Sequence, residues 1–98
     1  MVVMEMRWQG VTPEQYDEAK RRVDWEGNPH GAGLVHLAWF EDGALRCYDV
    51  WASEGAWGDF VQNRLMPVTS TLGITAEPEV TMHRAHDVFI HPEALTTA

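Results

Sequence analysis

The sequence predicts an α+β domain whose elements follow the order strand, helix, strand, strand, helix, strand. Three observations support this order. Thr12-Pro13-Glu14-Gln15 has the pattern of a capping box that starts a helix, Asp42-Gly43 is a strong hairpin signal, and Ser53 caps a second amphipathic segment. With right-handed crossovers, these elements form a four-stranded antiparallel sheet that carries both helices on one face.

The first half of the chain supplies a strand, a helix and a loop. Val2 to Trp8 alternates apolar and polar side chains for part of its length, as a half-buried strand does. The helix that begins at the capping box is expected to end near Trp25. Glu26 to Gly33 holds three glycines and a proline in eight residues, so it is a loop. A plain connector is favoured over a lid that closes on a cleft.

The hairpin and the second helix follow this loop. The hairpin strands are Leu34 to Phe40 and Ala44 to Trp51. We expect the second helix from about Glu54 to Leu65. Its apolar side chains recur at the spacing of one helical face: Trp57, Phe60, Val61 and Leu65.

The remaining residues complete the sheet and add a tail. Pro67 is expected to kink or interrupt the second helix, and a short helical turn over Val68 to Leu72 follows. Glu79 to His86 alternates again and predicts the fourth strand. The domain thus covers residues 1–86. Residues 87–98 form a C-terminal tail that contains the apolar segment Val88-Phe89-Ile90, which can pack on a partner subunit.

Composition and charge exclude several classes of function. The formal charge is −8, and the bases are scattered apart from Lys20-Arg21-Arg22, so neither nucleic acid nor an anionic membrane surface is an expected partner. The single Cys47 permits no internal disulfide and is expected to be a packed thiol. The first residues lack a signal-peptide pattern, and no apolar run approaches the roughly 20 residues of a membrane span. We therefore expect a cytoplasmic protein.

Apolar side chains fall on both faces of the predicted sheet, although the helices cover only one. Examples are Met4, Trp39, Tyr48 and Met82. A second copy of the chain would bury the uncovered face, so a two-fold homodimer is favoured over a monomer with a solvated sheet.

The element order and the junction Val50-Trp51-Ala52-Ser53-Glu54-Gly55-Ala56-Trp57 resemble the dimeric α+β barrel superfamily. The nearest likeness is to its antibiotic-biosynthesis-monooxygenase-like (ABM-like) branch, and it covers about residues 2–86. The resemblance implies a ferredoxin-like fold, a homodimer, and a ligand cleft between the sheet and the helices of each subunit. It also implies a range of activities that includes cofactor-free oxygenases, haem-degrading enzymes, polyketide cyclases and lactone isomerases.

Two histidines and one carboxylate are candidate catalytic residues. His36 lies in the middle of a predicted strand and His83 in the last strand, where an imidazole can act as a general base. A hydrogen-bonded sheet or interface histidine is the favoured structural alternative for both. Asp49 lies on a strand adjacent to that of Glu5, and two carboxyls on one face would hold a shared proton. The favoured alternative is that Glu5 pairs with Arg46 or Arg84.

Aromatic and polar side chains near the expected cleft are candidate ligand-binding residues. Trp51 at a strand end and Trp25 beside the loop are best placed to touch a ligand, whereas Trp57 and Phe60 fit the apolar helix face without one. Arg84 and Tyr48 could orient a carbonyl or hydroxyl group. The predicted ligand-binding set is Trp25, Trp39, Tyr48, Trp51, Phe60 and Arg84.

No cofactor or metal is expected. His83, His86 and His91 are not spaced to share a strand face with further ligands, and no phosphate-binding or dinucleotide motif is present. Haem-degrading relatives would carry a ligand histidine near the end of the second helix and an Asn on the first strand. Glu54 to Leu72 contains no histidine and Val2 to Trp8 no Asn, so haem degradation is not expected.

We therefore expect a cofactor-independent monooxygenase-like enzyme that removes a proton from a small aromatic or polyketide-like compound. The oxygen step is implied by the resemblance alone. A cyclase or isomerase would use the same deprotonation. A non-catalytic dimer that binds a small apolar ligand is the alternative from a different class.

Overall fold

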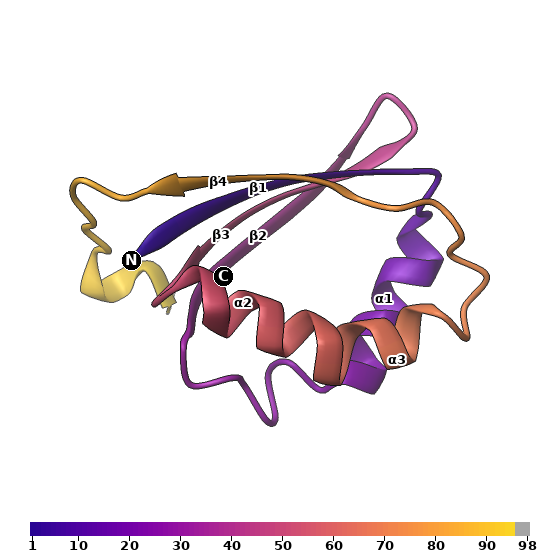
Figure 1. Ribbon diagram of the computed structural model, residues 1–98, viewed down its shortest axis with the longest axis horizontal. Helices are drawn as coiled ribbons and strands as arrows, with labels where there is room; N and C mark the ends of the chain where they lie inside the picture. Colours follow the sequence, from indigo (N-terminus) through magenta and orange to yellow (C-terminus); the bar gives the residue numbers. More distant parts are fainter. Residues whose placement is uncertain (96–98) are drawn as a thin grey trace.

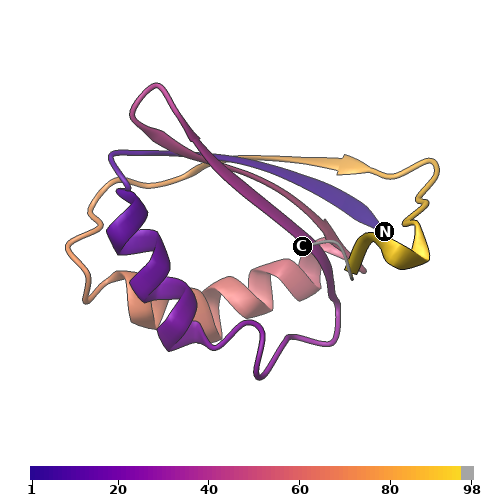
Figure 2. The same ribbon diagram turned by 180° about the vertical axis from the view of Figure 1, so that it is seen from behind.

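The computed structural model describes residues 1–95 and has the predicted α+β architecture. Strands β1 (Val2–Gln9), β2 (Gly33–Glu41), β3 (Ala44–Trp51) and β4 (Glu79–Arg84) form one antiparallel sheet in the order β2-β3-β1-β4. Figures 1 and 2 show that the helices lie on one face of this sheet and leave the other uncovered. This is the ferredoxin-like arrangement that the order of elements predicts.

Helix α1 (Pro13–Val23) begins as predicted and ends slightly earlier. Thr12 accepts a hydrogen bond from the backbone N–H of Gln15, whose side chain accepts one from the N–H of Thr12, so the capping box is confirmed. The helix stops before Trp25 because Asp24 adopts a left-handed conformation (φ 57°) and donates its N–H to the carbonyl of Lys20.

The hairpin turn is confirmed at Asp42 and Gly43, whose φ angles are 54° and 73°. Two positive φ angles are the requirement of the type I′ turn that an Asp-Gly pair favours. The turn sets the register of β2 against β3, and His36 of β2 stands directly opposite Asp49 of β3.

The second helical segment continues past the predicted interruption. Helix α2 (Glu54–Phe60) passes into a π-helical turn, η1 (Val61–Leu65), and then into α3 (Met66–Thr69) without a break. The N–H of Met66 bonds to the carbonyl of Val61, one residue further back than in an α-helix. Pro67 lies in the first turn of α3, where its missing N–H is tolerated, so the helix widens before the proline and does not stop there.

The two faces of the sheet differ in burial. The face toward the helices carries most of the core, including Met4, Trp8, Leu45, Cys47 and Trp51. The opposite face, here called the outer face, carries the alternate residues of each strand. Strand β4 ends at Arg84, so His86 lies beyond the sheet.

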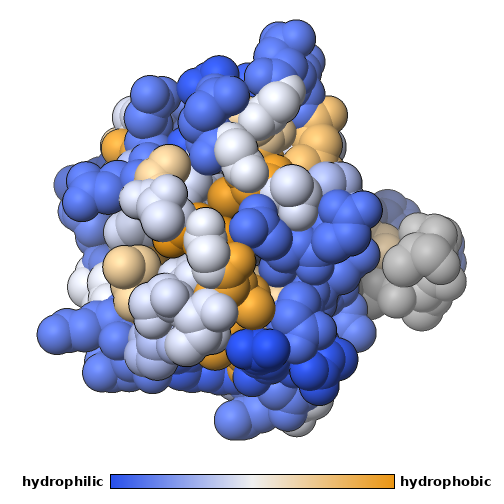
Figure 3. Space-filling model, turned by 90° about the vertical axis from the view of Figure 1, so that its right-hand side faces the viewer, coloured by the Kyte–Doolittle hydropathy of each residue, from blue (hydrophilic) through white to orange (hydrophobic). Residues whose placement is uncertain are grey.

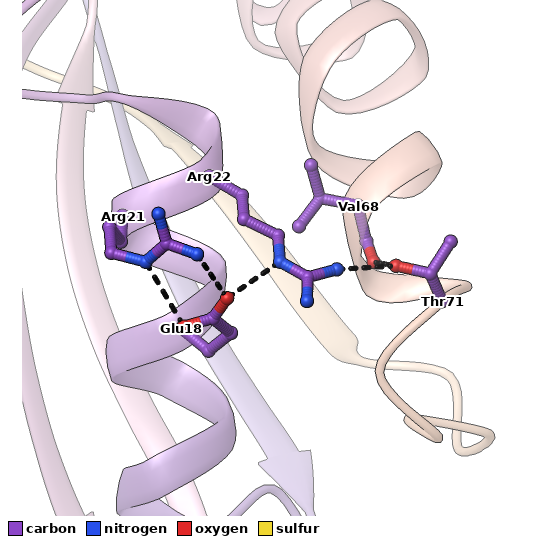
Figure 4. A network of polar contacts seen from close by, with 5 residues as sticks. All are labelled: Glu18, Arg21, Arg22, Val68 and Thr71. Carbon is purple, nitrogen blue, oxygen red and sulfur yellow. Dashed lines mark hydrogen bonds and ion pairs between the residues drawn. The ribbon is translucent and has the colours of Figure 1, made fainter.

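A network of polar contacts joins α1 to the end of the second helical segment (Figure 4). Glu18 accepts hydrogen bonds from Arg21 and Arg22, and Arg22 also donates to the hydroxyl of Thr71. That hydroxyl donates in turn to the carbonyl of Val68 at 2.7 Å. The network therefore links α1 to α3 and to the turn that follows α3.

The C-terminal tail leaves the sheet after β4. Within it, Pro92–Leu95 forms a short 3₁₀ helix, η2, and Phe89 is 80% exposed. Residues 96–98 of the predicted tail lie outside the described residues. No helix among the described residues is both long and apolar enough to cross a membrane.

Candidate functional site

A chain of four hydrogen-bonded side chains lies on the helix side of the sheet. The hydroxyl of Tyr16 is 2.7 Å from Nε2 of His36, and Nδ1 of the same ring is 2.7 Å from Oδ1 of Asp49. Oδ2 of Asp49 accepts a hydrogen bond of 3.1 Å from Nε1 of Trp51. The chain thus runs from helix α1 through strand β2 to strand β3.

Hairpin register brings three of these residues together. His36 and Asp49 are cross-strand partners, and Trp51 lies two residues beyond Asp49, so their side chains share one face. Tyr16 approaches from α1, where it lies on the same helical face as the buried Ala19 and Val23. The site is therefore built by the sheet and completed by one helix.

For a neutral imidazole at His36, the donors and acceptors in the chain assign the proton positions. The indole N–H of Trp51 is only a donor, so Asp49 must accept from it, and a carboxylate with two accepting oxygens satisfies both neighbours. His36 then donates from Nδ1, which leaves Nε2 to accept from the Tyr16 hydroxyl. This is the order hydroxyl, imidazole, carboxylate that proton-transfer sites use to hold one histidine tautomer.

The chain forms part of the wall of an apolar cavity of about 90 Å³. Tyr16, His36 and Asp49 line it, together with a core of apolar side chains that includes Met4, Met6, Trp8, Val23, Leu45, Trp57, Phe60 and Leu65. Figure 3 looks at the molecule from the right-hand side of Figure 1 and shows a narrow band of hydrophobic residues, bordered on one side by hydrophilic residues and on the other mainly by residues of intermediate hydropathy.

Two side chains at the cavity have raised pKa values. Burial, followed by the neighbouring Cys47 and Asp49, raises the pKa of Tyr16 to about 12. Burial and then Asp49 raise the pKa of the Cys47 thiol to about 12. Both groups are therefore protonated near neutral pH. The prediction of a packed, unpaired thiol at Cys47 is confirmed.

Trp25 covers His36 from the loop side. Its ring centroid is 5.6 Å from that of His36 and 5.2 Å from that of Phe60. Gly33 makes this position available, because a Cβ there would lie 2.7 Å from the Trp25 ring. Trp25 and Phe60, two of the predicted ligand-binding residues, both line the cavity.

The structure places the remaining candidates elsewhere. Trp51 is fully buried, donates a hydrogen bond to Asp49 and does not line the cavity. His83, Trp39 and Tyr48 lie on the outer face, and Arg84 ends β4 without lining the cavity. Of the three candidate catalytic residues, the cavity therefore gathers His36 and Asp49.

The prediction that Glu5 pairs with Arg46 or Arg84 was wrong. Glu5 stands opposite Tyr48, so it faces the outer side of the sheet whereas Asp49 faces the helices. Its ion-pair partner is His83 at 3.4 Å, and Arg46 pairs with Glu41 instead. Asp49 therefore shares its site with an imidazole and not with a second carboxyl.

Tyr16 is the participant that sequence reasoning missed. Helical periodicity reports only which face of α1 it occupies, so the sequence pattern assigns it no role beyond that of an aromatic residue near the cleft. The contact between His36 and Asp49, in contrast, could have been predicted from the sequence. Each residue stands five positions beyond the Glu41–Ala44 pair that flanks the two-residue turn, so hairpin register alone predicts that they meet.

Among residues 1–95, no cluster of three or more His, Cys, Asp or Glu side chains could hold a metal ion. A histidine–carboxylate pair without a third ligand falls short of the sets that bind transition metals. The chemistry that these side chains offer is proton transfer.

Comparison with known proteins shows the fold. No family model and no curated protein sequence matches the chain. It is similar to SnoaB, a cofactor-independent oxygenase from Streptomyces nogalater, with a TM-score of 0.64 and 16% identity over 92% of this chain and 97% of that one. An antibiotic biosynthesis monooxygenase gives a TM-score of 0.66 and 11% identity, over 89% and 100%. The protein of unknown function NE2512 from Nitrosomonas europaea gives 0.67 and 10%, over 92% and 93%. The chain therefore has the fold of the antibiotic biosynthesis monooxygenase structures.

Proposed function

We propose that this chain is a cofactor-independent, monooxygenase-like enzyme that removes a proton from a small aromatic compound, with His36 as the final proton acceptor. The observation that carries the proposal is the His36–Asp49 pair, 2.7 Å apart, in the wall of an apolar cavity. An imidazole can take up a proton near neutral pH. Asp49 stabilises the imidazolium that forms, as the carboxylate of a catalytic triad does.

Deprotonation would prepare the substrate for dioxygen. A phenolate or carbanion held in an apolar cavity is electron-rich and poorly solvated, so it can give electrons to oxygen. For a phenol with a free ring position, one oxygen atom enters the ring and the other leaves as water, giving a quinone. The substrate supplies all four electrons that dioxygen accepts. The similarity in fold to a cofactor-independent oxygenase supports this step.

Cavity size limits the substrate. Pockets for drug-sized ligands measure roughly 300–1,000 Å³. The cavity of about 90 Å³ is smaller than this, so it favours a small aromatic compound over a fused polyketide skeleton.

Oxygen consumption tests the proposal. Single-ring phenols and hydroxyquinones are screened for oxygen uptake, and His36→Ala is expected to lower kcat/KM by about 10²–10⁴-fold, as loss of a general base does. His86→Ala is the matched control, because His86 is exposed and lies outside the sheet. Turnover that His36→Ala leaves unchanged would exclude His36. Turnover without oxygen uptake would instead support an isomerase or cyclase, and binding without turnover would support a ligand-binding protein.

We also propose that the chain forms a homodimer through the outer face. Apolar side chains gather there on β2 and β3, where Leu37 is 56% and Tyr48 40% exposed and Trp39 packs on Tyr48. A patch of this kind normally marks an interaction site. Leu37→Glu should yield a monomer in sedimentation analysis. Met66→Glu, at a residue 47% exposed on the helical side, should not change the mass, and a dimer that survives Leu37→Glu would contradict the proposal.

A further inference from the structure

We infer that Tyr16, and not His36, is the catalytic residue that meets the ligand, and that the site selects a single-ring compound with an ionisable hydroxyl group. The inference rests on the proposed function and deepens it. The sequence pattern did not indicate this role for Tyr16. The hydrogen bonds made by His36 indicate it.

His36 has no nitrogen free to meet a ligand. Nδ1 donates to Asp49, and Nε2 accepts from the Tyr16 hydroxyl. Trp25 also lies beside the ring, with the two ring centroids 5.6 Å apart. A ligand could bond to Nε2 of His36 directly only by displacing the Tyr16 hydroxyl from its hydrogen bond.

The Tyr16 oxygen retains the capacity to accept a hydrogen bond. A phenol is one donor and also an acceptor, and Tyr16 uses its hydrogen on His36. Tyr16 also lines the cavity, so a ligand hydroxyl inside can donate to this oxygen. Because burial keeps the pKa of Tyr16 high, the side chain remains a neutral phenol near neutral pH. Tyr16 therefore transfers a proton to His36 and remains uncharged.

The proton transfer balances without another reactant. The ligand O–H bond breaks and its proton bonds to the Tyr16 oxygen, while the Tyr16 proton moves to Nε2 of His36. The products are a ligand anion, a neutral Tyr16 and an imidazolium held by Asp49. The negative charge on the ligand then faces the new phenol hydrogen on Tyr16.

The rest of the cavity defines the ligand. An apolar cavity of about 150 Å³ holds a benzene ring. The cavity of about 90 Å³ is smaller than this, so one ring enters only when lining side chains adjust, and three fused rings do not fit. Apart from the polar chain, Lys20, Cys47 and Thr69, its lining is apolar, so the ligand needs one hydroxyl and a largely apolar body.

Binding of 4-nitrophenol tests the inference independently of turnover. This single-ring phenol ionises near neutral pH, and only its phenolate absorbs strongly in the visible region. The wild-type chain is expected to bind it and lower its apparent pKa, so that the bound fraction is more coloured than free ligand at the same pH. Tyr16→Phe keeps the ring but should abolish the pKa shift, and His36→Gln should do the same. His86→Gln is the matched control for His36→Gln, since His86 is exposed and lies beyond the sheet.

Each outcome decides the question. A full pKa shift in Tyr16→Phe would show that His36 accepts the proton directly and would overturn the inference. No saturable binding by the wild type, or equal binding of a three-ring hydroxyanthraquinone, would overturn the ligand class. A pKa shift that depends on Tyr16 without oxygen uptake by any phenol would leave the inference standing and refute the proposed oxygenase. Circular dichroism of each variant confirms that it is folded.

Discussion

Replacing Asp49 by Asn tests the hydrogen-bond chain, because it exchanges one carboxylate oxygen for an NH₂ group and leaves the side chain the same shape. The carboxylate of Asp49 accepts from Nδ1 of His36 at 2.7 Å and from Nε1 of Trp51 at 3.1 Å. An Asn amide has one accepting oxygen and one donating NH₂ group. In Asp49→Asn, one of the two neighbours must therefore face a donor where it had an acceptor.

The size of the effect follows from which neighbour loses its acceptor. If the amide turns its NH₂ toward Trp51, two donors face each other in a site where Asp49 is only 5% exposed. An unpaired buried donor costs about 1–3 kcal/mol. For a chain of this size, each 1 kcal/mol lowers the melting temperature by about 4–8 °C. If the NH₂ turns toward His36, the imidazole must carry its proton on Nε2 and can no longer accept from Tyr16, an error of tautomer that lowers kcat by about 10⁴-fold in a triad.

A double-mutant cycle with Trp51→Phe separates this explanation from a general loss of stability. Removing the indole N–H lets the NH₂ group of the introduced amide face an apolar ring, and the amide oxygen can then accept from His36. Asp49→Asn should therefore cost about 0.5–3 kcal/mol less in the Trp51→Phe background, measured by urea unfolding. The 4-nitrophenol pKa shift should also partly return in the double variant. Costs that add within about 0.3 kcal/mol would refute the proton assignment.

Three further predictions concern the surroundings of the site. Gly33→Ala places a Cβ 2.7 Å from the Trp25 ring and should destabilise the fold by about 1–3 kcal/mol in urea unfolding, whereas Gly31→Ala, with nothing within 4 Å, should have little effect. The buried thiol of Cys47, whose pKa is raised to about 12, should react with a disulfide reagent at least about tenfold more slowly in the native than in the unfolded chain; equal rates would contradict its burial. Hydrogen bonds from two arginines lower the pKa of Glu18 to about 2, from 4.5, so Glu18 stabilises the fold above about pH 4.5, and this contribution is lost as the pH falls toward 2. Glu18→Gln should therefore lower the melting temperature near neutral pH and lose this effect progressively between pH 4.5 and 2; an effect independent of pH would argue against the ion pairs.

Most of the fold could be predicted because its signals are local. The capping box at Thr12–Gln15 and the Asp42-Gly43 turn depend on residues within four positions of one another. The exact end of α1, two residues before the predicted one, and the π-helical turn before Pro67 were not predicted. Both depend on how the backbone hydrogen bonds are shared near a helix end, which side-chain periodicity does not report.

The candidate site was predicted in part, and the misses have a common cause. His36 and Asp49 were named separately as candidates, although the hairpin register already made them partners. Tyr16 reaches them only through the packing of α1 on the sheet, a contact between residues 20 positions apart that no periodicity encodes. Trp51 was expected to contact a ligand because it ends a strand, but its ring is fully buried and its indole N–H donates a hydrogen bond to Asp49.

The site depends on a turn that takes no part in its chemistry. His36 and Asp49 stand opposite each other on one face only because the Asp42-Gly43 turn fixes the register of β2 against β3. Side chains alternate along a strand, so a slip of one residue would carry Asp49 to the opposite face from His36 and break the bond between them. The positive φ of both turn residues excludes most other sequences from this geometry without strain. The turn is therefore a requirement for proton transfer at His36 as well as for the hairpin.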